Sequence, residues 1–521
     1  MTPVPSVIAV CGAGTMGAGI AQLAAAAGAR VLVQDPQPGA VERGIEGIRD
    51  ALAKRVARGR AAQDDVDALL ARLEPASDLA ALAPAGLVIE AAPERLDVKR
   101  ELFGALEDLV AEEAVLATNT SSLSVTDVAA GARHPERVVG MHFFNPAPVM
   151  QLVEVVAGER SGAAALAVAR ATGEAMGKHV IATADGPGFL VNRCNRPFNL
   201  EALRLVSEGL ATPQQVDRIV RLGGGYRMGP FELMDLVGLD TTFAVQTSFW
   251  EQSYGEPRWR PFPSLGRMVA AGRLGRKTGE GFYTYPREAS EEPPAPEPGG
   301  GDGLVVVAGE TLLAAELLDA AASAGWDAAT PEEADGELPD LIVDCGATVD
   351  DPPLQGGPQL LLCDAAPLAG LDPGGASAGF FALSPFADSS LVELTRTPTT
   401  SDLAVRSAER FFASLGRHVE WVGDAPGLVL GRLVAQLVNE ACFALGEGLG
   451  TAEDVDLGMV LGLNHPRGPL EWADAIGAPT LLAVLDGLQA EYGEERYRAA
   501  PVLRRAVRFE NFLRGEGDGQ A

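Results

Sequence analysis

The sequence predicts an α/β fold in which a mostly parallel, doubly wound sheet is followed by an all-α domain, with a degenerate second copy of this pair. Three observations lead to this prediction. Strand-like and helical runs alternate over residues 1–184, helical periodicity replaces them over residues 185–286, and the helical motifs recur near the C-terminus. A chain of 521 residues is also too long for one ordinary core, so several domains are expected.

The first element pair is a βαβ unit with a glycine-rich turn. An apolar strand at residues 7–11 leads into the G-x-G-x-x-G turn of residues 12–17, an alanine-rich helix, a second strand at residues 30–34, and Asp35. The turn motif alone is weak, but strand, helix and acid together predict a Rossmann-type dinucleotide-binding domain. The alternative is a glycine turn in an α/β fold that holds no ligand.

Each of the three glycines in the turn has a physical role in this prediction. Gly12 permits the tight turn, Gly14 lets the backbone approach a pyrophosphate, and Gly17 lets the helix pack closely on the strand. Asp35 can accept hydrogen bonds from both ribose hydroxyls, whereas it would repel a 2′-phosphate. The cofactor is therefore expected to be NAD rather than NADP, and no arginine stands directly beside Asp35.

The rest of the first copy divides into a sheet domain and a helical domain. Further strands are expected at residues 86–91, 114–117, 138–143, 152–156 and 179–181, which completes a domain over residues 1–184. Helices are expected at residues 189–209, 212–222 and 234–254, within a helical domain over residues 185–286. Residues 287–303 are rich in Pro, Gly and Glu and cannot contribute to a core, so they are interpreted as a linker.

A repeat follows the linker. Residues 188–193 are echoed by residues 427–432 at an offset of 239 (427 − 188), and the same offset relates Glu201 to Glu440 and Asp235 to Asp474. A register held without gaps over some fifty residues predicts a duplicated domain pair. We expect a degenerate Rossmann-like domain at residues 304–423 and a second helical domain at residues 424–517.

Composition restricts the partners. The chain has 41 Lys+Arg against 71 Asp+Glu, a net charge of −30, which argues against nucleic acid or anionic membranes as partners. Its five cysteines are scattered without a C-x-x-C pair, so neither a disulfide framework nor a metal site is indicated. No apolar run approaches a membrane span, and a soluble, unprocessed, cytoplasmic protein is expected.

Two segments after the nucleotide-binding unit carry polar residues where chemistry is expected. Residues 118–123 (TNTSSL) directly follow an apolar strand, and His142 begins the run HFFNP, with Glu154 twelve positions later. Polar residues at the carboxyl ends of parallel strands form the usual ligand-binding edge of such sheets. If His142 and Glu154 meet across adjacent strands, the carboxylate would fix the imidazole tautomer of a general base. On spacing alone, a structural histidine is favoured over a general base.

These segments resemble the 3-hydroxyacyl-CoA dehydrogenase family over nearly all of residues 5–286. The matching segments are residues 12–17, Asp35, and residues 118–123, 142–146, 152–156, 187–193, 228–232 and 277–283. The resemblance implies that His142 removes the proton of the 3-hydroxyl while C3 passes hydride to the nicotinamide, and that Glu154 orients the histidine. It also implies that Ser121 and Asn192 hydrogen-bond the substrate, with Ser121 beside the nicotinamide, and that cofactor contacts include Met16, Glu94, Lys99, Asn145 and Lys277.

The CoA end of the site is suggested by a basic cluster. Lys54, Arg55, Arg58 and Arg60 form the densest group of cations in this acidic chain. A CoA-contacting lysine of the family falls on Arg58, which keeps the charge, whereas a contacting serine falls on Ala51. A solvated basic face is the alternative.

The second copy lacks the proposed chemistry. At the offset of 239, His142 corresponds to Phe381 and Asn192 to Gly431, and Ala366 stands where Ser121 is expected. Glu393 remains without a histidine, and residues 308–313 lack the glycine pattern. This layout resembles the long dehydrogenases of bacterial phenylacetate degradation, which act on 3-hydroxyadipyl-CoA, and residues 303–521 are expected to be a structural partner.

The expected function is therefore NAD-dependent oxidation of an (S)-3-hydroxyacyl-CoA to the 3-oxoacyl-CoA. 3-Hydroxyadipyl-CoA is the favoured substrate, and 3-hydroxybutyryl-CoA is the alternative. A crystallin-like NAD-binding protein without activity is the alternative of another class, but Ser121, His142, Glu154 and Asn192 are all retained. The oligomeric state is left open, a homo-oligomer included.

Overall fold

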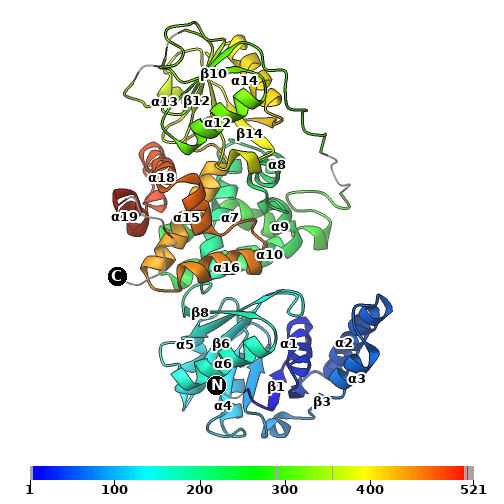
Figure 1. The fold of residues 1–521 in the computed structure, drawn as a ribbon. Helices are drawn as coiled ribbons and strands as arrows, with labels where there is room; N and C mark the ends of the chain where they lie inside the picture. The colour runs from blue at the N-terminus through cyan, green and yellow to red at the C-terminus, as the bar shows by residue number, and fades with distance from the viewer. Residues whose placement is uncertain (1–3, 288–291, 352, 355, 510–512, 514–521) are drawn as a thin grey trace. The chain divides into compact units, whose positions relative to one another are not determined.

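The chain folds into two compact units in the computed structural model, which describes residues 4–287, 292–351, 353–354, 356–509 and 513 (Figure 1). The first unit comprises Met1–Arg193 together with Gly448–Leu463, and the second comprises Cys194–Glu447 together with Asn464–Ala521. Residues 288–291 of the predicted linker and residues 510–512 and 514–517 of the predicted second helical domain lie outside the described residues.

The first unit is built on an eight-stranded sheet in the order β3-β2-β1-β4-β5-β6-β7-β8. All neighbouring strands are parallel except β6 and β7, which confirms the predicted mostly parallel, doubly wound sheet. The strands are β1 (Val7–Cys11), β2 (Arg30–Gln34), β3 (Leu73–Pro75), β4 (Leu87–Glu90), β5 (Val115–Thr118), β6 (Val138–Phe143), β7 (Leu152–Ala157) and β8 (His179–Ala184).

Helices cover both faces of this sheet because its strands are apolar on both sides. Ile8 and Val10 of β1 belong to one buried cluster, with residues of α1, α2 and α6, whereas Ala9 and Cys11 belong to another, with residues of α4 and α5. The helices are α1 (Thr15–Ala26), α2 (Ala40–Ala57), α3 (Gln63–Leu70), α4 (Leu96–Glu107), α5 (Val125–Ala129) and α6 (Ala163–Ala175).

One further helix of the first unit comes from the far end of the chain. Helix α16 (Ala452–Leu463) belongs by sequence to the second helical domain, yet it contacts β7 and β8. The reciprocal contact occurs in the second unit, where α8 (Pro213–Gly224) of the first helical domain contacts β14 and β15. The two copies have therefore exchanged equivalent helices, which residue spacing did not predict.

The second unit holds the remaining helices of both copies. The first copy contributes most of α7 (Val191–Ser207), then α8, α9 (Pro230–Val237), α10 (Leu239–Gln252) and α11 (Pro263–Ala270). The second copy contributes α15 (Leu430–Gly446), α17 (Pro469–Ile476), α18 (Ala478–Tyr492) and α19 (Pro501–Phe509). The single helix expected over residues 234–254 is wrong, because Gly238 adopts φ +104° and separates α9 from α10.

The second unit also contains a seven-stranded sheet in the order β10-β9-β11-β12-β13-β14-β15. Only β13 and β14 are antiparallel neighbours, so the order repeats that of the first sheet without its outermost strand. This confirms the degenerate second copy. The strands are β9 (Leu304–Ala308), β10 (Asp327–Ala329), β11 (Leu341–Asp344), β12 (Gln359–Leu362), β13 (Ala378–Phe381), β14 (Leu391–Thr395) and β15 (His418–Val422), with α12 (Leu312–Ser323), α13 (Leu368–Leu371) and α14 (Asp402–Ser414).

The described part of the predicted linker is fastened to the second unit. Glu292 accepts hydrogen bonds from Arg218 at 2.9 Å and from Arg221 at 3.2 Å. Farther along, the backbone N–H groups of Gly299 and Gly301 donate to carbonyls of the second Rossmann-like domain, at 2.8 and 3.0 Å. The segment therefore contacts both α8 of the first copy and the second Rossmann-like domain, even though it adds no large apolar side chain to a core.

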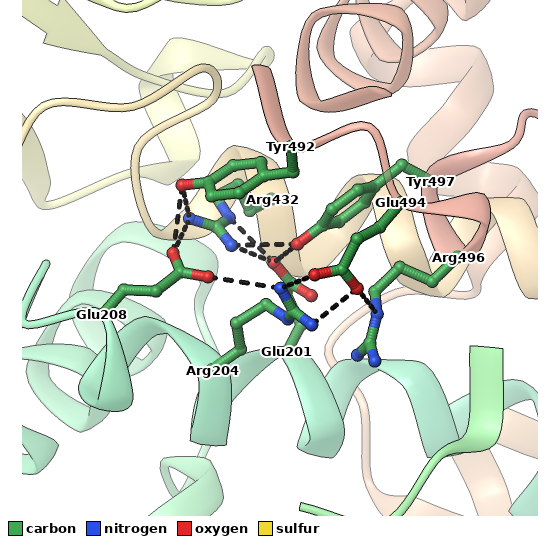
Figure 2. Close-up of polar contacts among 8 residues, drawn as sticks. All are labelled: Glu201, Arg204, Glu208, Arg432, Tyr492, Glu494, Arg496 and Tyr497. Atoms are coloured by element: carbon green, nitrogen blue, oxygen red, sulfur yellow. Dashed lines mark hydrogen bonds and ion pairs between the residues drawn. The ribbon is translucent and has the colours of Figure 1, made fainter. Parts of the chain in front are cut away.

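A buried polar cluster joins the helices of the two copies within the second unit (Figure 2). Arg432 of α15 is 0% exposed and donates to Glu201 of α7 at 2.8 Å and to Glu208 at 2.9 Å. Around this pair, Tyr497 donates to Glu201 at 3.0 Å, and Arg204 donates to Glu494 at 2.7 Å. A buried charge needs such a partner, so first-copy and second-copy helices depend on each other here.

Three further findings bear on composition. All five cysteines are free and buried. Among the described residues no group of His, Cys, Asp and Glu is placed to hold a metal ion. No helix in that part of the chain is long and apolar enough to cross a membrane.

Candidate active site

A cavity of about 1240 Å³ opens at the carboxyl ends of β1, β2 and β4 in the first unit. The glycine turn, Met16, Asp35 and residues of α2 and α4 line it. This is the edge at which open α/β sheets bind ligands, and the volume suits an extended molecule such as a dinucleotide.

The glycine turn has the geometry that a pyrophosphate requires. Gly12 adopts φ +104°, and a β-carbon there would lie 2.5 Å from the carbonyl oxygen of Ala91, while one at Gly17 would lie 1.8 Å from the carbonyl oxygen of Gly12. A β-carbon at Gly14 would meet no atom within 4 Å, so the backbone there is open to a ligand. Gly14 caps α1 without a side-chain hydrogen bond, which leaves the first N–H groups of the helix available to phosphate.

Asp35 is fixed at the end of β2. Its carboxylate accepts from the backbone N–H of Ala13 at 2.8 Å and from that of Gln37 at 2.8 Å. These bonds orient the carboxylate at the wall of the cavity, where its remaining lone pairs can accept from ribose hydroxyls. The residues of this cavity fit NAD.

His142 and Glu154 meet across the antiparallel strands β6 and β7, where they are register partners. The Nδ1 atom of His142 lies 2.6 Å from Oε2 of Glu154, and the two residues are 5% and 0% exposed. The imidazole ring also lies between two phenyl rings, with centroids 4.6 Å from Phe144 and 5.6 Å from Phe189. The ring is therefore held by the Glu154 carboxylate at Nδ1 and by the two phenyl rings, and Nε2 does not contact that carboxylate.

Glu154 has a second task at the start of α7. Its Oε1 atom accepts from the backbone N–H groups of Leu190 at 3.1 Å and Val191 at 3.0 Å. The carboxylate thus satisfies two N–H groups that a helix start leaves unpaired, and its charge is favoured by the helix dipole. Asn192, the next residue, is partly buried in the first turn of the same helix.

The loop after β5 is organised by Glu94. The Oε1 atom of Glu94 accepts from the hydroxyls of Thr120 at 2.6 Å and Ser122 at 2.9 Å and from the backbone N–H of Ser121 at 3.0 Å. Burial opposes ionisation, but Lys99 and these hydrogen bonds together lower the pKa of Glu94 below its usual value. The loop leaves Ser121 exposed at the sheet edge.

Two residues at this edge were not among the predicted site residues, although Asn119 lies in the segment 118–123 where chemistry was expected. Glu90, 0% exposed at the end of β4, accepts from Lys99 Nζ at 2.7 Å and from the Thr118 hydroxyl at 2.6 Å. Asn119 accepts from the backbone N–H of Phe143 at 2.8 Å, which ties the loop to the strand that carries His142. An acid that ends an apolar parallel strand is the sequence signal that could have identified Glu90.

The other predicted site residues have different surroundings. Lys99 is 1% exposed and held by Glu90 and Glu94, whereas Asn145 is exposed. Arg58 is exposed at the C-terminal cap of α2, and none of the ion pairs among the described residues involves it. Lys277 belongs to the second unit, where it pairs with Asp240.

In the second copy, the cavity and the helix start that correspond to the dinucleotide site differ from those of the first copy. Its cavity at the ends of β9 and β11 measures only about 270 Å³, and Thr311 caps α12 by accepting from the N–H of Ala314 at 3.1 Å. Glu393 still accepts from Val429 at 2.7 Å and from Leu430 at 2.9 Å, the counterparts of the Leu190 and Val191 bonds. Burial without a cationic neighbour raises the pKa of Glu393 to about 8.

The first unit thus combines a dinucleotide cavity with a buried histidine–carboxylate pair at one sheet edge, which defines an NAD-dependent dehydrogenase. Sequence models of the family agree with this class. The NAD-binding domain of 3-hydroxyacyl-CoA dehydrogenase matches residues 7–186, and the C-terminal domain of 3-hydroxyacyl-CoA dehydrogenase matches residues 188–285 and 427–521. The chain belongs to the 3-hydroxyacyl-CoA dehydrogenase family and is an NAD-dependent oxidoreductase.

Individual relatives extend the similarity to the whole chain. The 3-hydroxyadipyl-CoA dehydrogenase of Escherichia coli K12 is 37% identical over 508 residues, which cover 97% of this chain and 98% of that protein. Human mitochondrial hydroxyacyl-coenzyme A dehydrogenase is 41% identical over 284 residues, 53% of this chain and 90% of its own. The crystal structure of 3-hydroxybutyryl-CoA dehydrogenase from Escherichia coli K12 superposes with a TM-score of 0.79 at 35% identity, covering 97% of this chain and 98% of that one.

Proposed function

We propose that His142 is the general base of the dehydrogenase and that Glu154 orients it. The proposal rests on the 2.6 Å contact between Nδ1 of His142 and Oε2 of Glu154. A carboxylate at Nδ1 selects the tautomer with a lone pair on Nε2 and stabilises the imidazolium that forms when Nε2 takes a proton. The two flanking phenyl rings restrict the imidazole, so that Nε2 keeps one direction.

The reaction then follows from this placement. Nε2 of His142 takes the proton of the substrate 3-hydroxyl, the C3–H bond breaks as hydride leaves, and C3 and its oxygen form the carbonyl. This hydride would be accepted by bound NAD. Ser121 and Asn192 are proposed to hydrogen-bond the substrate oxygens, and Ser121 to lie beside the nicotinamide.

Cofactor contacts are proposed for the turn residues Gly12, Gly14 and Gly17 and for Asp35, because all four line the cavity or shape its wall. Met16 also lines it, while Glu94, Lys99, Asn145 and Lys277 are carried over from the family resemblance. Arg58 is proposed to contact a CoA phosphate. It lies with Lys54, Arg55 and Arg60 in an exposed cationic group that suits such a partner in an otherwise acidic chain.

Replacement of His142 tests the base assignment. His142→Ala should lower kcat by about 10²–10⁴-fold, the usual contribution of a positioned base, while NADH binding measured by fluorescence stays near wild type. Turnover within about threefold of wild type would remove His142 from the mechanism.

The favoured substrate is 3-hydroxyadipyl-CoA, with 3-hydroxybutyryl-CoA as the second candidate. Support comes from the E. coli relative named for the adipyl substrate, which matches this chain through both copies. The name of the matched crystal structure points to the butyryl substrate instead. A comparison of kcat/KM for the two thioesters decides between these substrates, and a higher value for the butyryl thioester would overturn the adipyl proposal.

We also propose that the enzyme is cytoplasmic, because all five cysteines are free and buried.

A further inference from the structure

Helix α16, which comes from the copy without catalytic residues, packs on the sheet that carries His142 and Glu154. It contacts β7, the strand of Glu154, and the neighbouring strand β8. The helix starts at a defined place, since the hydroxyl of Thr451 accepts from the N–H of Asp454 at 3.1 Å while the Asp454 carboxylate accepts from the Thr451 hydroxyl at 2.8 Å. Such a cap satisfies an N–H group at the helix start and so defines where the helix begins.

Two glycines lie on the face of α16 that meets the sheet, Gly458 in the helix interior and Gly462 next to its last residue. Gly458 and Gly462 are four residues apart and thus lie one above the other. An interior glycine costs a helix about 1 kcal/mol relative to alanine. Here the close approach of α7 and β8 favours glycine, because a β-carbon at Gly458 would lie 2.8 Å from Cγ2 of Val191 and 3.2 Å from Cδ1 of Ile181.

Gly462 lies close to three residues that adjoin the catalytic pair. A β-carbon there would lie 3.0 Å from Leu152, 3.2 Å from Phe144 and 3.2 Å from Val191. Phe144 is the ring that lies 4.6 Å from the His142 ring, and the N–H of Val191 donates to Glu154 at 3.0 Å. Leu152 is two residues before Glu154 on β7 and therefore on the same face of the strand.

The same contact recurs in the second unit, where there is no catalytic pair to hold. Gly223 of α8 is the counterpart of Gly462 (462 − 223 = 239), and a β-carbon there would lie 3.1 Å from Leu430 and 3.5 Å from the Leu391 carbonyl oxygen. Leu430 and Leu391 are themselves the counterparts of Val191 and Leu152 at that offset. The molecule thus contains its own matched control for the contact.

We propose that α16 is a positioning element of the active site and that Gly458 and Gly462 are positioning residues for the His142–Glu154 pair. The copy that has lost its own chemistry supplies the surface against which Phe144, Leu152 and Val191 are fixed. This inference rests on the catalytic roles proposed for His142 and Glu154, and its test, a comparison of kcat between equivalent glycine variants, is separate from the His142→Ala test of those roles.

The first experiment compares Gly462→Ala with Gly223→Ala. Both changes add one methyl to the end of an equivalent helix, so both should lower the melting temperature by similar amounts. Gly462→Ala should lower kcat by about 5- to 50-fold with KM values within about threefold, because a misplacement of about 1 Å in a site can cost ~10²-fold. It should also shift the acid limb of the kcat–pH profile, whereas Gly223→Ala should keep both kcat and the profile. Equal effects of the two variants on kcat, or an unchanged kcat in Gly462→Ala, would overturn the proposal.

A second experiment is independent of the first and tests the proposal even if Gly462→Ala does not fold. Gly458→Ala should lower kcat, and Val191→Ala in the same chain should restore it at least partly, since it removes the methyl group that the new β-carbon meets. With Val191→Ala alone, the four proteins form a double-mutant cycle for kcat. Additive effects in this cycle would contradict a positioning contact between α16 and the start of α7. His142→Ala remains the separate test of the base, so loss of either idea can be recognised without the other.

Discussion

The ring of Phe381 fills the space beside Gly431 in the second unit. A β-carbon at Gly431 would lie 2.5 Å from Cζ of Phe381 and within 2.9 Å of two further ring atoms. These positions correspond to His142 and Asn192 in the first copy, so the two replacements are physically linked: a phenyl ring occupies the room that an asparagine would need. At these two positions the second copy therefore has a close apolar contact where the first copy has two polar residues.

We expect Phe381→His to leave turnover unchanged and Gly431→Asn to lower stability. The asparagine would have to displace the buried Phe381 ring, and overpacking of this kind typically costs about 1–3 kcal/mol. Urea denaturation measures the loss, and a steady-state assay shows whether turnover per folded chain is kept. The double variant Phe381→His with Gly431→Asn should be more stable than Gly431→Asn alone. A wild-type denaturation midpoint for Gly431→Asn would contradict the packing account.

The two equivalent glutamates should separate helix anchoring from catalysis. Glu393→Ala removes the acceptor of two N–H groups at the start of α15 and should cost about 1–3 kcal/mol of stability while kcat stays near wild type. Glu154→Gln should lower kcat but by less than His142→Ala, because the imidazole remains. If Glu393→Ala reduced kcat as much as Glu154→Gln, the second copy would have to act on the reaction directly.

The buried ion pair between the copies should dominate the stability of the second unit. Arg432→Met leaves Glu201 buried without its cation and should cost about 3–5 kcal/mol. Arg504→Met breaks the exposed pair with Asp486 and, as the control, should cost no more than about 1 kcal/mol. Equal shifts of the denaturation midpoint in the two variants would mean that the cluster in Figure 2 does not hold the copies together.

Removal of the second copy should damage the first. A chain ending after Pro286 lacks both Arg432 and α16, and we expect it to self-associate or to unfold at a lower temperature even though it keeps His142, Glu154, Ser121 and Asn192. Light scattering and calorimetry measure the two outcomes. A stable, monomeric and fully active truncated protein would show that the second copy is dispensable.

Acidification should lower the stability of the folded chain through the buried His465, which packs against Tyr226. The two rings meet edge to face at 5.0 Å, and burial lowers the pKa of His465 to about 3. The unfolded chain takes up a proton near the ordinary histidine pKa of about 6.5 but the folded chain does not, so this group's contribution to stability is complete above that pH and falls as the pH decreases. The loss should be about 1.4 kcal/mol per pH unit below 6.5, and His465→Phe should remove that part of the slope. Identical pH dependence in the two proteins would exclude His465 as its source.

Asp35 should make the enzyme strongly selective for NAD over NADP, because its fixed carboxylate repels a 2′-phosphate. Asp35→Asn keeps the shape and should narrow the ratio of kcat/KM values for the two cofactors. Equal kcat/KM values for NAD and NADP in the wild-type enzyme would contradict this reading of Asp35.

Much of this architecture could be predicted because local patterns determine it. The apolar strands gave the sheet, and the strand–turn–helix context identified the glycine turn from neighbouring residues alone. The role of α16 could not be predicted, since roughly three hundred residues separate it from β7 and no spacing rule relates them. The position of Glu90 at the end of an apolar strand could have marked it, but its contacts with Lys99 of α4 and Thr118 of β5 form only in the folded domain.

The exchange of α8 and α16 also has a consequence for how the enzyme responds to dilution. When a supporting helix comes from a separate subunit, the fraction of competent sites falls as subunits dissociate. Here a covalent tether keeps α16 at an effective concentration that does not depend on how much protein is present. The specific activity per chain should therefore stay constant on dilution, even where a two-subunit arrangement would lose it.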